Sequence, residues 1–191
     1  MHQTEVNQLI DKDWVPKVLG FWLDEVGPDG WFEQKDETDE LIRTRFGVLY
    51  EALFSAAPST SFDSAEEALA AIIVFDQFPR NMFRGQPRAF ASDDMAAAIA
   101  RKAVERGFDG EVAEERRIFF YMPLMHAENL ADQEHCVALT SALPSDHVKY
   151  AREHRDIIAR FGRFPHRNRA LGRETTDAEQ AFLAGHKGFG Q

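Results

Sequence analysis

Two short stretches of the chain repeat the same unusual set of arginine and asparagine residues. Each has the order Phe-x-x-Phe-Pro followed by Arg-Asn-x-x-x-Gly; the first spans residues 75–85 and the second residues 161–172, with His166 as an extra residue. Arginine binds carboxylates and phosphates through two parallel hydrogen bonds. Because these donors need partners once they are buried, the two stretches, named here the Pro-Arg-Asn corners, are the strongest candidates for a binding site.

The arginines of the two corners would line one anion pocket if the corners pack against each other. The ligand predicted for that pocket is a small phosphorylated or carboxylated metabolite. In the alternative interpretations the arginines pair only within the protein, for example Asp76 with Arg163 or Arg167, or they form a surface for a protein partner. A buried arginine without any partner is strongly destabilising, so some partner must exist. The predicted ligand-binding residues are Asp76, Arg80, Asn81, Arg84, Arg163, Arg167 and Asn168.

Three further residues are predicted to be catalytic, namely His126, Glu128 and His166. A histidine with a glutamate suits general acid–base chemistry, but on a regular helix two residues of this spacing point about 200° apart. The break at Pro123 could bring them together. His154 and His166 lie among arginines, whose positive charge favours the neutral imidazole. The alternative for each histidine is a packing role with a hydrogen bond to a carbonyl. No metal site is predicted, because no short ligand spacing supports one.

The charge of the chain is distributed unevenly. The formal net charge is −10, which argues against general binding to nucleic acid or anionic lipid. Residues 152–173 nevertheless hold seven arginines against two acidic residues, and residues 80–88 hold three arginines and no acidic residue. Both basic clusters coincide with the Pro-Arg-Asn corners, which agrees with an anionic ligand there.

The length and composition indicate one ordinary globular domain, residues 1–191. A chain of 191 residues buries roughly 70% of its unfolded surface, and 44% of its residues are hydrophobic. The longest apolar run, residues 68–75, is too short to cross a membrane, and no secretory leader is predicted. The single cysteine, Cys136, excludes an internal disulfide, so a cytoplasmic location is expected. The sequence assigns no cofactor and no oligomeric state.

Apolar residues at helical spacing predict an all-α fold, and no stretch alternates well enough for a strand. Thr38, Ser64, Ser92 and Thr176 are predicted N-caps, with capping boxes at Ser64 and Thr176. Residues 58–61 are predicted to form a loop, and residues 78–91, with two prolines and a glycine, to be irregular. The helices are expected near residues 13–26, 38–57, 64–76, 92–107, 111–123, 126–143, 144–161 and 176–185.

Four groups of residues together resemble a bacterial family known only as domain of unknown function 924. They are Trp31-Phe32, the first corner from Asp76 to Gly85, the stretch Phe119–Glu128 with Gln133, and the second corner from Arg160 to Arg173. The resemblance covers nearly the whole chain and implies a helical fold akin to tetratricopeptide-like bundles. It implies no established reaction, substrate or catalytic residue. One departure is Met125, where glutamate is commoner in the family.

Two hypotheses about function follow. In the first, the chain binds or acts on a small anionic metabolite; the sequence does not decide between binder and enzyme. In the second, it is a helical adaptor that binds a protein segment, and the corners only brace the fold. The first requires the two corners and His126 to converge, whereas the second requires an exposed apolar groove elsewhere. The arginine clusters favour the first.

Overall fold

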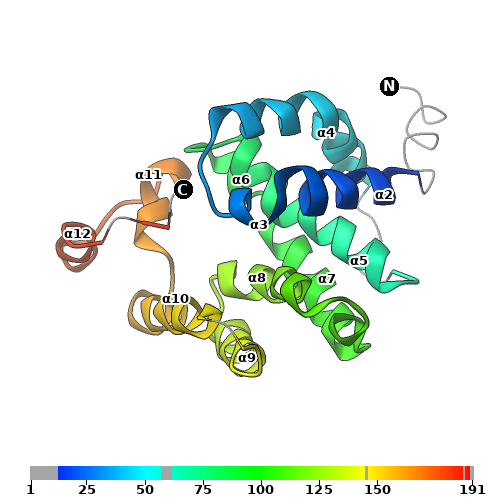
Figure 1. Cartoon of the computed structure of the whole chain (residues 1–191). Helices are drawn as coiled ribbons and strands as arrows, with labels where there is room; N and C mark the ends of the chain where they lie inside the picture. The colour runs from blue at the N-terminus through cyan, green and yellow to red at the C-terminus, as the bar shows by residue number, and fades with distance from the viewer. Residues whose placement is uncertain (1–12, 57–61, 145, 187, 190–191) are drawn as a thin grey trace.

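Every regular element of the described structure is helical. The computed structural model describes residues 13–56, 62–144, 146–186 and 188–189, and these ranges contain no strand (Figure 1). The predicted all-α class is therefore confirmed. The loop expected at residues 58–61 lies outside the described residues.

The first part of the chain supplies most of the helices that pack around the hydrophobic core. Its elements are α2 (Trp14–Leu19), η1 (Gly20–Val26), α3 (Gly27–Gly30), α4 (Asp36–Ala56), α5 (Ala65–Ile72), η2 (Ile73–Gln77), α6 (Phe78–Met82), η3 (Pro87–Phe90) and α7 (Asp93–Glu105).

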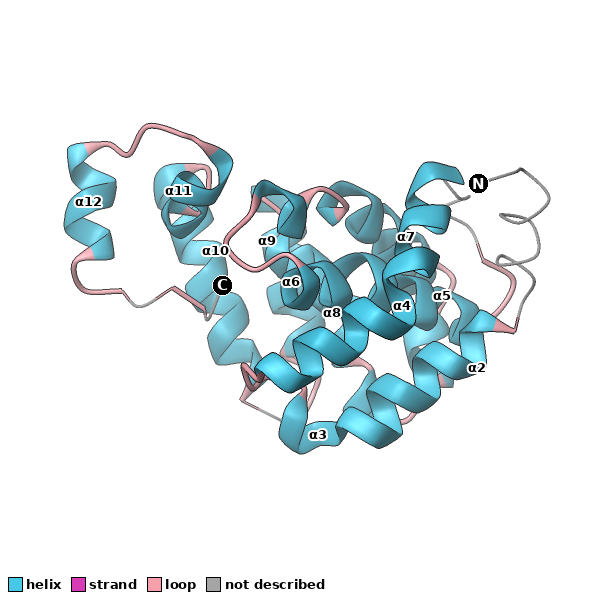
Figure 2. Ribbon diagram, turned by 90° about the horizontal axis from the view of Figure 1, so that it is seen from above, coloured by secondary structure: helices cyan, strands magenta, loops and turns pink. Residues whose placement is uncertain are grey.

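The second part of the chain begins with elements that pack against the same hydrophobic core and ends in a smaller helical region. Its elements are η4 (Phe108–Glu111), η5 (Glu114–Arg116), α8 (Ile118–His126), α9 (Leu130–Thr140), α10 (His147–Phe161), η6 (Pro165–Arg167), α11 (Asn168–Leu171) and α12 (Asp177–Leu183). Figure 2 shows α11 and α12 at one end of the molecule, connected to the rest through α10.

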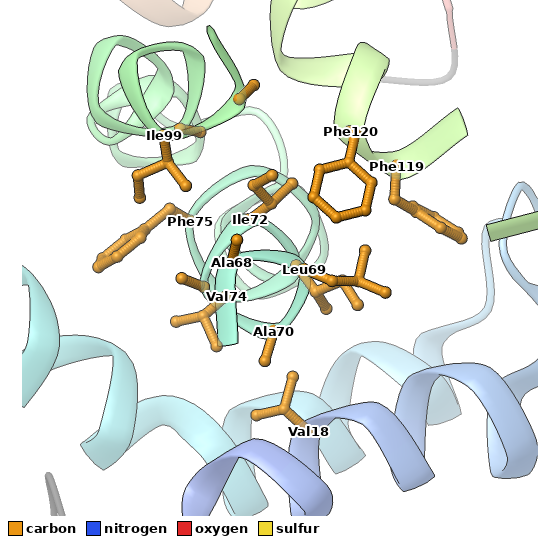
Figure 3. Close-up of a cluster of buried hydrophobic side chains, with 14 of the residues drawn as sticks. Val18, Ala68, Leu69, Ala70, Ile72, Val74, Phe75, Ile99, Phe119 and Phe120 are labelled. Atoms are coloured by element: carbon orange, nitrogen blue, oxygen red, sulfur yellow. The ribbon is translucent and has the colours of Figure 1, made fainter. Parts of the chain in front are cut away.

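The elements α5, η2 and α6 follow one another without a break and form the centre of the hydrophobic core. The turn from Ile72 to Phe75 is fully buried on all sides, as expected for a helix that is apolar around its whole circumference. Figure 3 shows Ile99 of α7, Phe119 and Phe120 of α8 and Val18 of α2 around this central helix. The site residues that follow in the chain are therefore held by a rigid support.

The middle of this central helix widens into π-helical turns at Ile73–Gln77. Pro79 has no N–H, so the α-helical hydrogen bond to the carbonyl of Phe75 cannot form. The hydroxyl of Ser92 donates to that carbonyl at 2.6 Å. Ser92 is the N-cap residue of α7, as predicted, but its side chain makes no cap hydrogen bond, because the hydroxyl donates to the carbonyl of Phe75.

Several predicted boundaries differ from the structure. Residues 78–82 were expected to be irregular but form α6, because a proline is tolerated in the first turn of a helix. The helix expected from residue 111 begins at Ile118, after two 3-10 turns. The segment 126–143 is not one helix: Ala127 is extended, and the side chain of Asn129 accepts from the amide of Asp132 to start α9.

Two capping predictions are confirmed. Ser64 accepts a hydrogen bond from the amide of Glu67 at the start of α5. Thr176 and Glu179 form a complete capping box at the start of α12. The helix α4 begins at Asp36, two residues before the expected cap Thr38.

None of the helices within the described ranges has the length and apolarity needed to pass through a lipid bilayer.

The two Pro-Arg-Asn corners differ in backbone conformation. The first corner is α-helical from Phe78 to Met82, whereas the second passes through the 3-10 turn η6 into the single turn α11. Gly162, with φ of +69°, ends α10 in the left-handed region, which glycine adopts without strain. The second corner packs on a small hydrophobic cluster of Ile157, Ile158 and Phe164.

We expect Ser92→Ala to lower the free energy of unfolding by about 1–3 kcal/mol, because it removes a buried hydrogen bond to the carbonyl of Phe75. Urea denaturation measures the change. Ser141→Ala is the control, since the exposed hydroxyl of Ser141 bonds a carbonyl that water can reach. Equal stability of Ser92→Ala and wild type would contradict this role of the hydroxyl.

Candidate functional site

The carboxylate of Asp93 joins the two Pro-Arg-Asn corners. Its Oδ2 accepts a hydrogen bond from Nη2 of Arg80 at 3.0 Å and one from Nη1 of Arg167 at 3.1 Å. Both arginines are buried, with 8% and 4% of their surface exposed. The corners, far apart in the sequence, therefore converge on the first residue of α7.

The two arginines are bonded to very different extents. Arg80 also donates from Nη1 to the backbone carbonyl of Asp76 at 2.6 Å and lies 3.4 Å from the carboxylate of that residue. The hydrogen bond to Asp93 is the only one that the side chain of Arg167 makes with the described residues. The guanidinium carbon of Arg167 lies 4.6 Å from the ring centres of both Phe90 and Phe164.

Several buried polar atoms of this cluster have no hydrogen-bond partner among the described residues. They are Nε of Arg80, Nε of Arg167 and Oδ1 of Asp93. Buried polar atoms are nearly always hydrogen-bonded in proteins, so three unsatisfied atoms in one cluster are exceptional.

The pKa values of the two arginines shift in opposite directions. Burial opposes the charge of Arg80, but Asp93 and Asp76 outweigh it and raise the pKa of Arg80. Burial and the neighbouring Arg80 lower the pKa of Arg167 to about 10 in spite of Asp93. The positive charge of Arg167 is thus incompletely compensated by the protein.

Asp76 and His126 form a buried pair next to the arginines. Oδ1 of Asp76 lies 2.8 Å from Nδ1 of His126, and Nε2 of Gln77 donates to Oδ2 at 2.5 Å. Burial alone would raise the pKa of Asp76, but the stronger opposite effect of His126 and Arg80 lowers this pKa to about 2. Because Asp76 is ionised, it accepts the proton on Nδ1 of His126.

The second nitrogen of His126 is therefore the basic one. Burial and Arg80 lower the pKa of His126, so the ring is neutral near pH 7 and Nε2 carries a lone pair. A carboxylate that fixes the imidazole tautomer in this way is the arrangement used by general-base histidines.

Two more histidines lie beside His126. The ring centre of His154 is 6.3 Å away, and Nδ1 of His154 donates to the carbonyl of Tyr150 at 2.8 Å. Burial, together with His126, lowers the pKa of His154 to about 3. The ring of Phe189 stacks on His154 at 3.7 Å and meets His166 edge-on at 5.6 Å. The predicted residue His166 thus borders the histidine cluster, and Phe189 covers it.

The remaining predicted residues of the first corner lie in a separate bracing cluster. The amide of Asn81 donates to Oδ1 of Asp39 at 2.7 Å, and Nε of Arg84 donates to Oδ2 of the same carboxylate at 2.5 Å. Asp39 belongs to α4, so these contacts fasten the corner to α4 rather than lining the convergence of the two corners.

The second corner has an equivalent brace. Nε of Arg163 donates to Glu179 at 2.7 Å, and the amide of Asn168 contacts the same carboxylate at 3.3 Å. Asp76 is an expected partner of Arg163 or Arg167, but among the described residues its carboxylate contacts His126, Gln77 and Arg80 instead.

Glu128 does not accompany His126. The helix α8 ends at His126, and the extended Ala127 turns the chain so that Glu128 meets the second corner. Its Oε1 accepts from the amide of Phe164 at 2.8 Å, and Oε2 accepts from Arg173 at 2.7 Å. Both oxygens of Glu128 are therefore occupied by contacts that hold the corner.

The sequence did not single out two residues of the convergence. Asp93 was identified only as part of a helix start, where the helix dipole favours an acidic residue whether or not it forms an ion pair. His154 was considered as a neutral imidazole among the arginines, able to act as a base or metal ligand, but was not among the predicted site residues. Across the described ranges, no group of three His, Cys, Asp or Glu side chains has an arrangement that could hold a metal ion.

Comparison with known proteins identifies the chain by family. Residues 18–187 match the family model described as bacterial protein of unknown function (DUF924). The structure is similar to that of a protein of unknown function from Agrobacterium tumefaciens, with a TM-score of 0.85 and 39% identity, over 91% of this chain and 98% of that one. No curated protein matches the chain.

The buried histidines make the stability of the fold depend on pH. Between about pH 6.5 and pH 3 the unfolded chain binds a proton at His154 that the folded chain does not, because the folded pKa is about 3. The free energy of unfolding therefore falls as the pH drops through this interval, by up to about 1.4 kcal/mol per unit. The lowered pKa of His126 acts in the same direction.

We expect His154→Phe to reduce this loss of stability between pH 7 and pH 5 by up to about 2 kcal/mol. Urea denaturation at several pH values measures the difference. The exposed His135 provides the control variant His135→Gln, which should keep the wild-type profile. Identical profiles for His154→Phe and wild type would show that His154 titrates normally.

Proposed function

The chain belongs to the bacterial family of unknown function DUF924, and we propose that it binds a small phosphorylated or carboxylated metabolite at Arg80 and Arg167. His126 then acts on this ligand as a general base. The buried guanidinium group of Arg167 carries the proposal, because its single hydrogen bond and lowered pKa leave it short of negative partners.

A carboxylate or phosphate supplies what the two arginines lack. A guanidinium group has five N–H donors, and Arg167 uses one of them with the described residues. An anion accepts two parallel hydrogen bonds from such a group and adds the negative charge that Asp93 alone does not provide. Arg80 is already compensated by Asp76 and Asp93, so it serves mainly to position Asp93 and to add positive potential.

His126 supplies the acid–base chemistry of the proposal. Its neutral ring presents a lone pair on Nε2, and Asp76 stabilises the imidazolium that forms when this atom takes a proton. The arginines would hold the anionic group of the ligand while His126 removes a proton from an adjacent O–H, N–H or C–H group or from water. A ligand that reaches both His126 and His154 must displace Phe189 from its stack on His154.

A thermal-shift panel of phosphate esters and carboxylates tests the binding step. A ligand at 100 times its dissociation constant stabilises by about 2.7 kcal/mol, which is a rise of roughly 5–11 °C for a chain of this size. We expect a selective rise in the wild type and its loss in Arg167→Gln. The exposed Arg169 gives the matched control, Arg169→Gln, which should keep the rise. A flat wild-type response across the panel would reject the anion site.

The catalytic step has its own test. His126→Gln should keep the thermal shift, because the arginines and not the base hold the anion. NMR spectra of the bound compound should show its conversion by the wild type and not by His126→Gln. Binding without any conversion by the wild type would reject the role of His126 and leave a binding protein.

The two arginines should differ in their contribution to stability. Arg80→Met should lower the free energy of unfolding by about 3–5 kcal/mol, because it removes the arginine that two largely buried carboxylates, Asp76 and Asp93, share. Arg167→Met should change it by less than about 1 kcal/mol or raise it, since it removes a charge that burial disfavours. Urea denaturation measures both. Equal, large losses in the two variants would support a purely bracing role for both corners.

A further inference from the structure

A second concave surface lies outside the convergence of the two corners. It is a cleft of about 580 Å³ between α10 and α12, a size within the usual range of ligand sites. His154, which belongs to the candidate site, lies on a different face of α10 and does not line the cleft. The lining residues are Val148, Lys149, Arg152, Glu153, Asp156, Ile157, Arg160, Phe161, Phe182 and His186.

The floor of the cleft is apolar and partly aromatic. The rings of Phe161 and Phe182 are 5.2 Å apart, and the buried Ile157 lies beside them in the lining. The guanidinium carbon of Arg160 lies 4.6 Å from the centre of the Phe161 ring. An apolar floor of this kind binds side chains of a partner that would otherwise be exposed to water.

The rim of the cleft carries cations without ion-pair partners. Lys149, Arg152 and Arg160 form no salt bridge within the described ranges, although the chain as a whole is strongly acidic. The two acidic residues of the rim are both paired: Glu153 contacts His186 at 3.2 Å, and Asp156 contacts Arg155 at 2.6 Å.

The spacing of these charges distinguishes between possible occupants. Lys149 and Arg152 lie 8 to 11 residues before Arg160 on the same helix, which places cations at both ends of the cleft, about 12–16 Å apart. An acyl chain with one anionic head group needs cations at one end only. A nucleic-acid strand carries negative charge throughout and would meet Glu153 and Asp156 in the middle. A peptide can place acidic residues at its ends and apolar residues between them.

We infer that the cleft between α10 and α12 binds an acidic, amphipathic segment of a partner protein. The apolar side chains of the segment contact Phe161 and Phe182, and acidic side chains about 8–11 residues apart on a helix pair with Lys149 or Arg152 at one end and with Arg160 at the other. This partner site is additional to the proposed anion site, and neither depends on the other.

Selection of random 16-residue peptides displayed on phage against the full chain tests this inference. We expect enriched peptides with acidic residues 8–11 positions apart and apolar residues between them. Fluorescence polarisation of a synthetic copy of an enriched peptide should show that it binds Arg160→Glu at least about 10-fold more weakly than the wild type. The substitution replaces an attractive contact with a repulsive one. The exposed Arg169→Glu, which changes the charge equally outside the cleft, should bind as the wild type does.

Charge reversal separates a direct contact from a general charge effect. A peptide in which the acidic residue facing Arg160 is replaced by lysine should regain binding to Arg160→Glu and lose it with the wild type. The inference is overturned if no peptide is enriched, or if the selected peptides bind Arg160→Glu as tightly as the wild type. Stronger competition by dodecanoate or by a single-stranded oligonucleotide than by the unlabelled peptide would assign the cleft to those ligands instead.

Discussion

The burial of two guanidinium groups around one carboxylate is the constraint on which the rest of the structure depends. Arg80 and Arg167 meet at Asp93 inside a fold whose other buried side chains are mainly apolar. A buried charge is tolerated only with fixed partners, so the corners cannot move independently of α7. The clusters around Asp39 and Glu179 occupy other donors of the two corners and hold each corner in the orientation that this convergence requires.

A single proline links the fold to the site. Pro79 removes one donor from the central helix, and the hydroxyl of Ser92 satisfies the carbonyl that is left over. This contact fastens the start of α7 to the wide turn that carries Asp76, so that Asp93 lies next to Arg80. Widened helical turns occur often at functional sites because they redirect side chains without ending the helix. Here the redirected residue is Asp76, the partner of His126.

The helices were predictable because their signals are local, whereas the partners in the site were not. The caps Ser64 and Thr176 follow from residues three positions apart, and the apolar spacing defines α10. The corners were recognisable from their repeated residue types, yet the choice of Asp93 as their common partner depends on the packing of α7 against the central helix. Glu128 was grouped with His126 because the extended conformation of Ala127 leaves no strong mark in the sequence.

The two corners show how one motif can take two roles within a fold. In the first corner Arg80 is stabilised in its charged form by two carboxylates and lies beside the large hydrophobic core. In the second, Arg167 is held in its charged form against the effect of burial and rests on a small cluster of three buried residues. A destabilised charge persists where the surrounding structure is stable enough to tolerate it, and such groups concentrate at functional sites. The large core supplies that stability, so the first corner supports the position of Arg167, the residue at which we propose that an anion binds.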